Sequence, residues 1–204
     1  MNIGDVRLPR RYTLAKRAEQ LTATRTRIVE ATLAIYREQG YAAATTHAVA
    51  RAADVAPATV RNHFPTPADL AAAAADAVLA DTGLPDAEIF EGLPGQAARV
   101  ERLARELAAF FERSTSWWQV LQRDPDLAAA WGGLEARYND HLSRLAAAAV
   151  EPGGGDAAST AVVLTMVGGP LYFALRGAGR TSHETVEIEL ALILPWLARR
   201  RRTP

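Results

Sequence analysis

The chain has 204 residues, of which 49% are hydrophobic, and this is enough apolar material to bury a core and to exclude global disorder. It contains no cysteine, which excludes disulfide bonds and thiolate chemistry. The formal net charge is zero, but residues 1–64 hold ten arginines and lysines against five acidic residues. A basic amino-terminal third on an otherwise acidic chain indicates a nucleic-acid face at one end and a different task at the other.

Residues 1–21 are weakly patterned, and we expect them to form a basic arm before the first helix. Its cationic side chains are Arg7, Arg10, Arg11, Lys16 and Arg17. Such an arm either enters the minor groove of DNA beside the binding site or stays a solvated tail. It lacks the apolar stretch of a secretory signal, so we expect a soluble cytoplasmic protein.

The first helix is expected to begin near Thr24, a suitable N-cap, and to end at Gly40. Its inward-facing residues recur at helical spacing. They are Ile28, Ala31, Thr32, Ile35 and Tyr36.

Residues 45–64 indicate two short helices joined by a tight turn. Thr46 is a candidate cap for the first of them, and Val49, Ala50 and Ala53 are its inward positions. Asp54 lies in the turn, where a left-handed backbone is common and aspartate tolerates it.

The second of these helices has an outward face of small residues, a hydroxyl, an amide and arginine, without an obvious catalytic group. Pro57 suits its first turn, and Val60 and Phe64 anchor it inward. This chemistry is typical of a helix–turn–helix that binds DNA.

The rest of the chain is patterned as helices, and nothing in it alternates with period two. Thr66, Pro67 and Asp69 form a strong start for a helix that should run from 66 to about 80. A linker is expected at 84–95. The later helices are predicted at 96–113, 116–122, 125–149, 157–176 and 183–199. The fold class is therefore all-α, with about nine helices.

Several breaks and caps divide this helical body. Asp124 caps the helix that begins with Pro125, and Thr181 forms a capping box with Glu184. Pro195 should kink or end the last helix at Leu194. Residues 157–175 are apolar, but hydroxyls, glycines and a proline interrupt them, so a buried helix is favoured over a membrane span.

The span from Thr24 to Leu70 resembles the TetR family of bacterial one-component transcriptional regulators. The resemblance rests on residue types at fixed spacing. They are Thr24, Arg25, Ile28, Ala31, Gly40, Tyr41, Thr45, Thr46, Val49, Ala50, Ala53, Val55, Thr59, Val60, His63, Phe64, Asp69 and Leu70. The resemblance implies a DNA-binding domain at 22–83, which includes the linking helix 66–80, and a ligand-binding and dimerisation domain at 84–204.

Four positions depart from the family pattern. Asp54 replaces the turn glycine, Ala56 replaces a Ser/Thr cap, and Pro67 replaces a lysine that contacts the DNA backbone. Arg61 replaces a tyrosine that contacts phosphate. The arginine either takes over that phosphate contact or reads guanine bidentately, and both roles remain open.

Helix geometry and the resemblance together indicate which residues meet DNA. Thr45 and Thr46 suit phosphate contacts, Asn62 suits adenine, and Ala58 and the Thr59 methyl group suit thymine methyls. The full set of expected DNA-binding residues is Arg25, Thr45, Thr46, Pro57, Ala58, Thr59, Arg61, Asn62 and His63.

The resemblance also implies a ligand pocket and a dimer interface in the body, although the aromatic and apolar residues concerned suit a plain core as well. The candidate pocket residues are Phe110, Trp117, Trp118, Trp131, Tyr138, His141, Met166, Tyr172 and Phe173. The candidate dimer residues are Leu164, Gly168, Leu171, Leu175, Val186, Leu190, Ile193 and Leu197. Two such helices from each of two chains would form a four-helix interface.

We therefore expect a DNA-binding transcriptional regulator, in particular a homodimeric repressor released from a pseudo-palindromic operator by a small hydrophobic or aromatic ligand. The alternative is a DNA-binding dimer without a ligand, controlled by a protein partner or by abundance. An enzyme is disfavoured because the four histidines are scattered and no glycine-rich phosphate loop follows a strand. His183 and Glu187 lie four residues apart, but two ligands are too few for a metal site. No cofactor, metal or membrane partner is expected.

Overall fold

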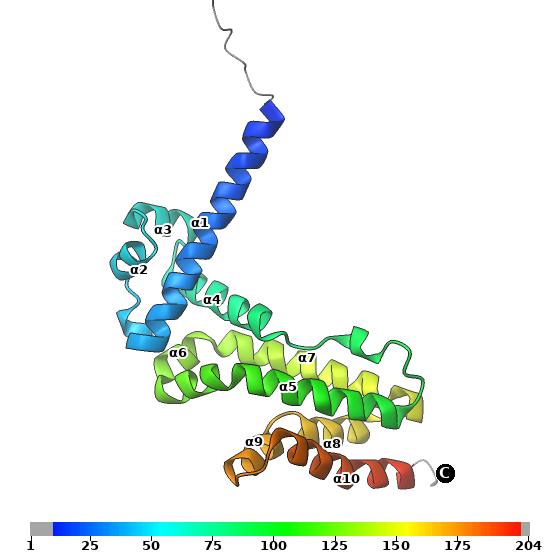
Figure 1. The fold of residues 1–204 in the computed structure, drawn as a ribbon. Coiled ribbons are helices and arrows are strands. Elements are labelled where there is room, and N and C mark those ends of the chain that lie inside the picture. Colours follow the sequence, from blue (N-terminus) through cyan, green and yellow to red (C-terminus); the bar gives the residue numbers. More distant parts are fainter. Residues whose placement is uncertain (1–9, 201–204) are drawn as a thin grey trace, which may run out of the picture. The chain divides into compact units, whose positions relative to one another are not determined.

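The computed structural model describes residues 10–200, with side chains from residue 16 onward. This part of the chain forms ten α-helices and three short 3₁₀ helices without any strand, which confirms the all-α prediction (Figure 1). It divides into two compact units. The first holds the residues up to Ala77 together with Arg123–Ala130, and the second holds Val78–Gln122 and the residues from Trp131 onward.

The first unit is a small helical domain built around a long first helix. Its elements are α1 (Arg10–Gln39), the 3₁₀ helix η1 (Tyr41–Ala43), α2 (Thr46–Ala52), α3 (Pro57–His63), most of α4 (Pro67–Thr82) and α6 (Pro125–Ala130). The inward positions expected on the first three helices are buried apart from Ala31, which is half-buried; Ile28 and Val49 are fully covered and Phe64 is 3% exposed. Because α1 begins at Arg10, the second half of the expected arm is helical, while the first half lies outside the described residues.

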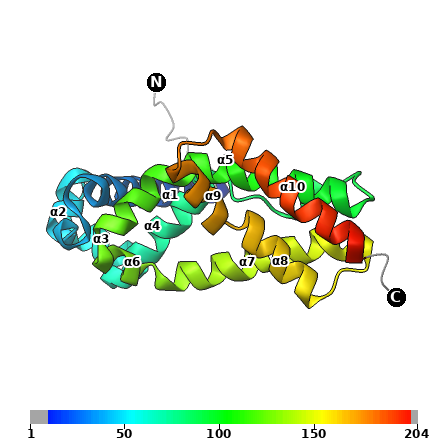
Figure 2. The same cartoon turned by 90° about the horizontal axis from the view of Figure 1, so that it is seen from below.

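The second unit is a two-layered helical body. Its elements are the 3₁₀ helices η2 (Ala87–Phe90) and η3 (Glu151–Gly153) and the helices α5 (Gln96–Arg123), α7 (Gly132–Val150), α8 (Ala157–Val167), α9 (Pro170–Gly177) and α10 (Ser182–Arg200). The helix α8 packs against α7, and α8, α9 and α10 pack against one another, so that these three form a layer beside α5 and α7 (Figures 1 and 2). One continuous cluster of buried apolar side chains joins the layers, from Val100 on α5 to Leu197 on α10.

The helix boundaries in this body differ from the expected ones at three places. Residues 96–113 and 116–122 form one helix because Ser114 and Thr115 donate their hydroxyls to carbonyls one turn back, at 2.8 and 2.7 Å, instead of ending the helix. The expected helix 125–149 is divided at Trp131 into α6 and α7. The expected helix 157–176 is divided at Gly169, whose φ of 129° lies outside the helical region.

The two predicted capping boxes are present, whereas Thr24, the expected cap of the first helix, lies inside α1. Thr66 and Asp69 close a capping box with contacts of 2.7 to 3.1 Å, and Thr181 and Glu184 close another. The helix α10 continues through Pro195 to Arg200, so it does not end at Leu194, which was one of the two effects predicted for this proline. Pro195 has no N–H to donate one turn back. The buried side chains of Ile193 and Leu197, on either side of it, keep this part of the helix packed in the core.

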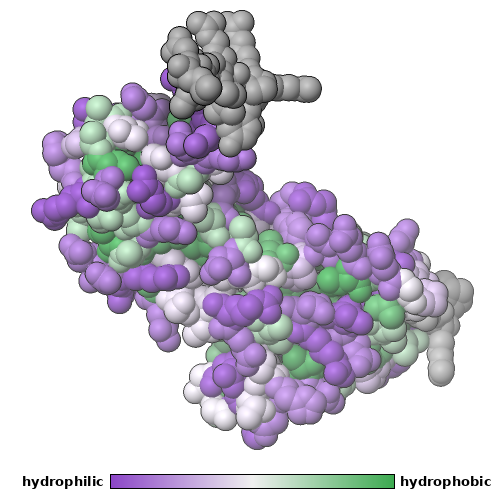
Figure 3. Space-filling model, turned by 45° about the horizontal axis from the view of Figure 1, so that its top comes forward, coloured by the Kyte–Doolittle hydropathy of each residue, from purple (hydrophilic) through white to green (hydrophobic). Residues whose placement is uncertain are grey.

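The segment Ala157–Gly177 is the one part of the described chain that is long and apolar enough to cross a membrane, and 28% of its apolar 18-residue window is buried. On the face of the molecule in Figure 3, hydrophilic residues predominate and hydrophobic residues gather in separate patches.

Candidate nucleic-acid interface and ligand cavity

The turn between α2 and α3 is closed by backbone hydrogen bonds around a left-handed aspartate. Asp54 has a φ of 52° and is the one described non-glycine residue with a positive φ. The Val55 N–H donates to the Ala50 carbonyl at 2.9 Å, and the Asp54 N–H donates to the Arg51 carbonyl at 3.3 Å. This pair of bonds is the Schellman arrangement that usually places glycine at the left-handed position. The predicted left-handed turn is therefore present, with aspartate in place of glycine.

The cap of α2 is Thr45 and not the expected Thr46. Thr45 has an extended backbone, with φ −65° and ψ 154°, so its hydroxyl oxygen reaches back to accept from the Ala48 N–H at 3.2 Å. Thr46 is the first residue of the helix and is half-buried. The Thr45 hydroxyl is exposed and keeps its own proton for a second acceptor.

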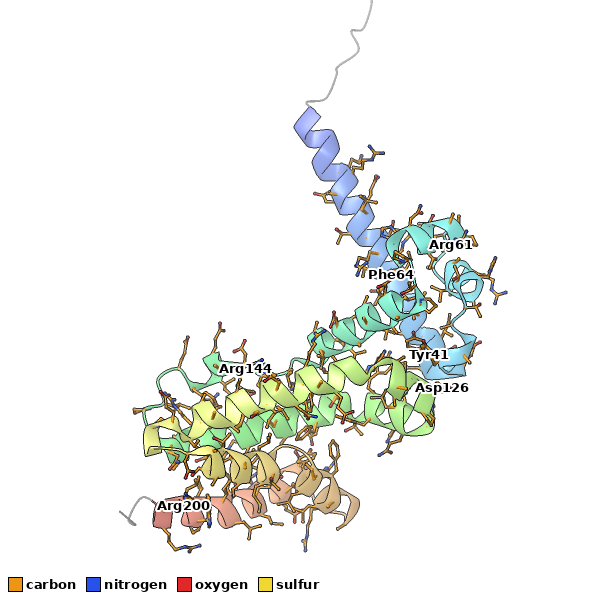
Figure 4. The ribbon with its side chains drawn as sticks, turned by 180° about the vertical axis from the view of Figure 1, so that it is seen from behind. Tyr41, Arg61, Phe64, Asp126, Arg144 and Arg200 are labelled. Atoms are coloured by element: carbon orange, nitrogen blue, oxygen red, sulfur yellow. The ribbon has the colours of Figure 1, made fainter. Side chains whose placement is uncertain are left out.

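The helix α3 turns an apolar side inward and a polar side to solvent. Val60 is 2% exposed and Phe64 is 3% exposed. Ala58, Arg61 and Asn62 are exposed, and their positions place them on the opposite side of the helix. Figure 4 shows Arg61 on the outer side of α3 and Phe64 at its inner end near α1. The other two α3 residues expected at DNA, Pro57 and Thr59, are half-buried.

Arg25 of α1 fastens the end of α3. Its guanidinium carbon lies 4.3 Å from the centroid of the Phe64 ring, and its Nη1 donates to the His63 carbonyl at 3.3 Å. His63 itself is half-buried. Arg25 was expected to contact the DNA backbone from the first helix, and the structure gives its side chain a role in holding α3 on α1.

The short segment after α5 belongs to the first unit, and two side chains fasten it there. Asp124 accepts from the Tyr41 N–H with Oδ2 at 2.6 Å and from the Leu127 N–H with Oδ1 at 3.0 Å. The Arg123 guanidinium donates to the carbonyl of Arg37 in the last turn of α1. Sequence reasoning identified Asp124 as a cap for the following helix, but it did not indicate the contact with Tyr41, 83 residues away. Figure 4 shows Tyr41 next to α6, on which Asp126 is labelled.

The second unit contains a cavity of about 380 Å³ between α5, α7 and the junction of α8 and α9. Its walls are formed by Phe111, Trp118, Gln122, Tyr138, Asn139, Gly168, Gly169, Pro170 and Phe173. Three of the expected pocket residues, Trp118, Tyr138 and Phe173, line it. Sequence reasoning missed Gln122, and its spacing of four residues from Trp118 is the available signal that the two share one face of α5.

The other expected pocket residues lie away from the walls of this cavity. Most are core residues, with Phe110 2%, Trp117 4% and Trp131 4% exposed, and Tyr172 is 2% exposed. The remaining two, His141 and Met166, are not part of this fully buried group. His141 has its Nε2 2.7 Å from the Pro85 carbonyl, and Met166 packs partly buried against the core.

The expected dimer stripe of α10 faces the core of its own chain. Val186, Leu190, Ile193 and Leu197 are all at most 7% exposed, because this side of the helix packs within the second unit. The outward apolar side of α10 is instead the one that carries Leu192, which is 54% exposed. On α8 and α9 the expected residues Leu164, Gly168, Leu171 and Leu175 are half-buried.

Two hydrogen-bonding groups in the cavity wall lack partners among the described residues. The indole N–H of Trp118 and the hydroxyl of Tyr138 are buried and unpaired. Burial raises the pKa of Tyr138, so its hydroxyl stays protonated at neutral pH. The described residues include no group of three or more metal-ligating side chains.

Comparisons with known proteins agree with this geometry. Residues 28–74 match a family model described as bacterial regulatory proteins of the tetR family. A crystal structure of the multidrug binding protein EbrR complexed with imidazole aligns with a TM-score of 0.53 at 23% identity, over 83% of this chain and 94% of that one. A TetR-like transcriptional regulator from Rhodococcus sp. RHA1 aligns with a TM-score of 0.52 at 19% identity, over 94% and 99% of the two chains. A search of curated proteins gave no match. The two structures show that the fold is shared along most of the chain.

Proposed function

We propose that this chain, whose residues 28–74 match the TetR family, is a DNA-binding transcriptional regulator of that family. In particular, it is a repressor that a small hydrophobic ligand releases from a pseudo-palindromic operator. The observation that carries this proposal is the exposed row Ala58, Arg61 and Asn62, which buried Val60 and Phe64 fix on the outer side of α3.

The row has the chemistry for reading base edges in the major groove. Asn62 suits a bidentate contact with adenine, and the methyl groups of Ala58 and Thr59 suit thymine. Arg61 reads guanine or grips a phosphate. Pro57 is the first residue of α3, where its fixed φ suits the first turn of the helix.

Phosphate contacts would orient this row on the duplex. The exposed hydroxyl of Thr45 can donate to a phosphate while its oxygen caps α2. Thr46 begins α2 and His63 ends α3. Both are half-buried, so they suit contacts with phosphates at the border of the DNA interface. Arg25 would act indirectly by holding α3 in place.

A homodimer would supply two such helices to the two halves of the operator. We place its interface on the outward sides of α8 and α10, where Leu192 is exposed and Ala161, Ala191 and Pro195 lie beside solvent. Only 28% of the apolar 18-residue window within Ala157–Gly177 is buried within one chain, which favours burial of the rest against a second copy.

Ligand control has a route along α5. This helix is continuous from Phe111 and Trp118 in the cavity wall to Arg123, whose guanidinium holds the Arg37 carbonyl. The next residue, Asp124, holds the amide of Tyr41 in the segment that leads into α2. A ligand that binds more tightly when the end of α5 is displaced would therefore weaken DNA binding. The size of the effect equals the difference in its affinity for the two states.

The decisive experiment is selection of bound DNA from random duplexes, followed by binding measurements on the selected site. Arg61→Ala and Asn62→Ala should each weaken specific binding by about 1–3 kcal/mol. Arg144→Ala, on the surface of the second unit, is the control and should leave binding unchanged. If no specific site emerges, or if neither α3 substitution weakens binding, the assigned interface is wrong. A selected palindrome near the gene's own promoter would support repression, whereas tight binding that no hydrophobic compound alters would favour the dimer without a ligand.

A further inference from the structure

The cavity in the second unit has a wall of aromatic rings in mutual contact. The ring centroid of Phe173 lies 5.1 Å from that of Phe111 and 5.9 Å from that of Trp118. Tyr138 continues the wall, with its centroid 6.4 Å from that of Trp118. The ring planes of Phe173 and Trp118 are inclined at 65° to each other, so a flat ligand that stacks on one of these rings meets the other edge to face.

No residue of this wall carries a charge. The polar side chains among the lining residues are the carboxamides of Gln122 and Asn139, the indole of Trp118 and the phenol of Tyr138. A charged ligand would leave water for this cavity without an opposite charge to meet it, and such a transfer is strongly unfavourable. The walls therefore favour a ligand that is uncharged.

The same walls provide hydrogen bonds at one edge of the ring surface. Gln122 and Asn139 are exposed, and a carboxamide both donates and accepts. The unpaired groups of Trp118 and Tyr138 lie in the same wall. A buried hydrogen-bonding group without a partner is unfavourable, so a ligand that lets the wall rearrange around a hydroxyl or carbonyl would gain free energy from it.

The size of the cavity suits a compound of one or a few fused rings. Its volume of about 380 Å³ lies near the lower end of small-molecule sites. Gly169 forms part of the wall, and its φ of 129° is one that a residue with a side chain rarely adopts.

We propose that this cavity binds an uncharged, planar aromatic compound that stacks on one of the Phe173 and Trp118 rings, meets the other edge to face, and presents a hydroxyl or carbonyl edge to Gln122 and Asn139. This inference rests on the proposed function, since it names the class of ligand that would release the operator.

Three probes with one ring system and different charges test the proposal at neutral pH: 1-naphthol, 1-naphthoate and 1-naphthylmethylammonium. The full chain should bind 1-naphthol at one saturable site per chain in calorimetry, and it should bind the two ions at least about tenfold more weakly. Equal or tighter binding of either ion would overturn the proposal, and so would the absence of saturable naphthol binding.

Side-chain variants locate the site. Phe173→Ala and Gln122→Ala should each weaken naphthol binding, by about tenfold for the ring and several-fold for the amide. Gln119→Ala is the matched control, because Gln119 is exposed on the same helix and does not line the cavity. Equal effects of the two glutamine substitutions, or an unchanged affinity in Phe173→Ala, would refute the assignment.

Whether a bound probe lowers the affinity of the protein for its selected operator distinguishes this proposal from the proposed function. If naphthol binds as described but leaves DNA affinity unchanged, ligand control of repression fails and the ligand class stands. If the cation binds and releases DNA, ligand control stands and the ligand class fails.

Discussion

Substitution of Asp124 by alanine should loosen the segment 123–130 from the amino-terminal domain. The carboxylate holds two backbone amides, those of Tyr41 at 2.6 Å and Leu127 at 3.0 Å. A hydrogen bond to a charged group contributes about 1.5–3 kcal/mol, and a helix cap contributes about 1 kcal/mol. Because one side chain makes both bonds, the losses are not independent, and we expect a destabilisation of roughly 2–4 kcal/mol.

Amide hydrogen exchange at Tyr41 reports this loss locally, and urea unfolding reports it globally. In Asp124→Ala the Tyr41 amide should exchange faster, whereas Asp124→Asn should keep part of the protection because its amide oxygen still accepts. Asp126→Ala is the matched control. Asp126 lies exposed in the same first turn of α6, where its charge contributes only the helix-dipole term of about 0.3–1 kcal/mol.

Two results would refute this reasoning. One is unchanged protection of the Tyr41 amide in Asp124→Ala. The other is an equal loss of stability in Asp126→Ala, which would show that the general charge of the turn matters and not the contact between Asp124 and Tyr41.

Three further predictions follow from single positions. Asp54→Ala should destabilise the protein by about 1 kcal/mol, because alanine is strained at the left-handed φ of 52°, whereas Asp54→Gly should not; equal thermal stability of the two variants would contradict the assigned strain. Glu189 is buried, and loss of solvation raises its pKa to about 8, so the folded state binds its proton more tightly than the unfolded state. Stability should therefore be highest below the ordinary carboxyl pKa and should fall as pH rises toward 8, by at most about 1.4 kcal/mol per pH unit. Thermal melts of Glu189→Gln across this range should have a flatter pH dependence, and an unaltered slope would exclude Glu189 as its source. Leu192→Glu should shift sedimentation from dimer to monomer, while Leu21→Glu, at the similarly exposed leucine of α1, should not; a dimer that survives Leu192→Glu would reject the outward face of α10 as the interface.

The sequence alone determined the features that depend on neighbours within about one helical turn. The inward positions Val49, Val60 and Phe64 follow from helical spacing, and the capping box of Thr66 and Asp69 follows from two residues three apart. The left-handed turn at Asp54 follows from the packing pattern on either side of it. Such features are local, so the residue types carry the information directly.

Only the tertiary structure decided which of several suitable surfaces is used. The helix α10 has apolar residues on more than one side, and packing against the rest of the second unit chose the side of Ile193 for the core and left Leu192 outside. Phe110 and Phe111 are adjacent and chemically alike, yet only Phe111 lines the cavity. The contact between Asp124 and Tyr41 joins residues 83 apart. In each case the outcome depends on how distant helices meet, and the spacing of residues along one helix does not contain that information.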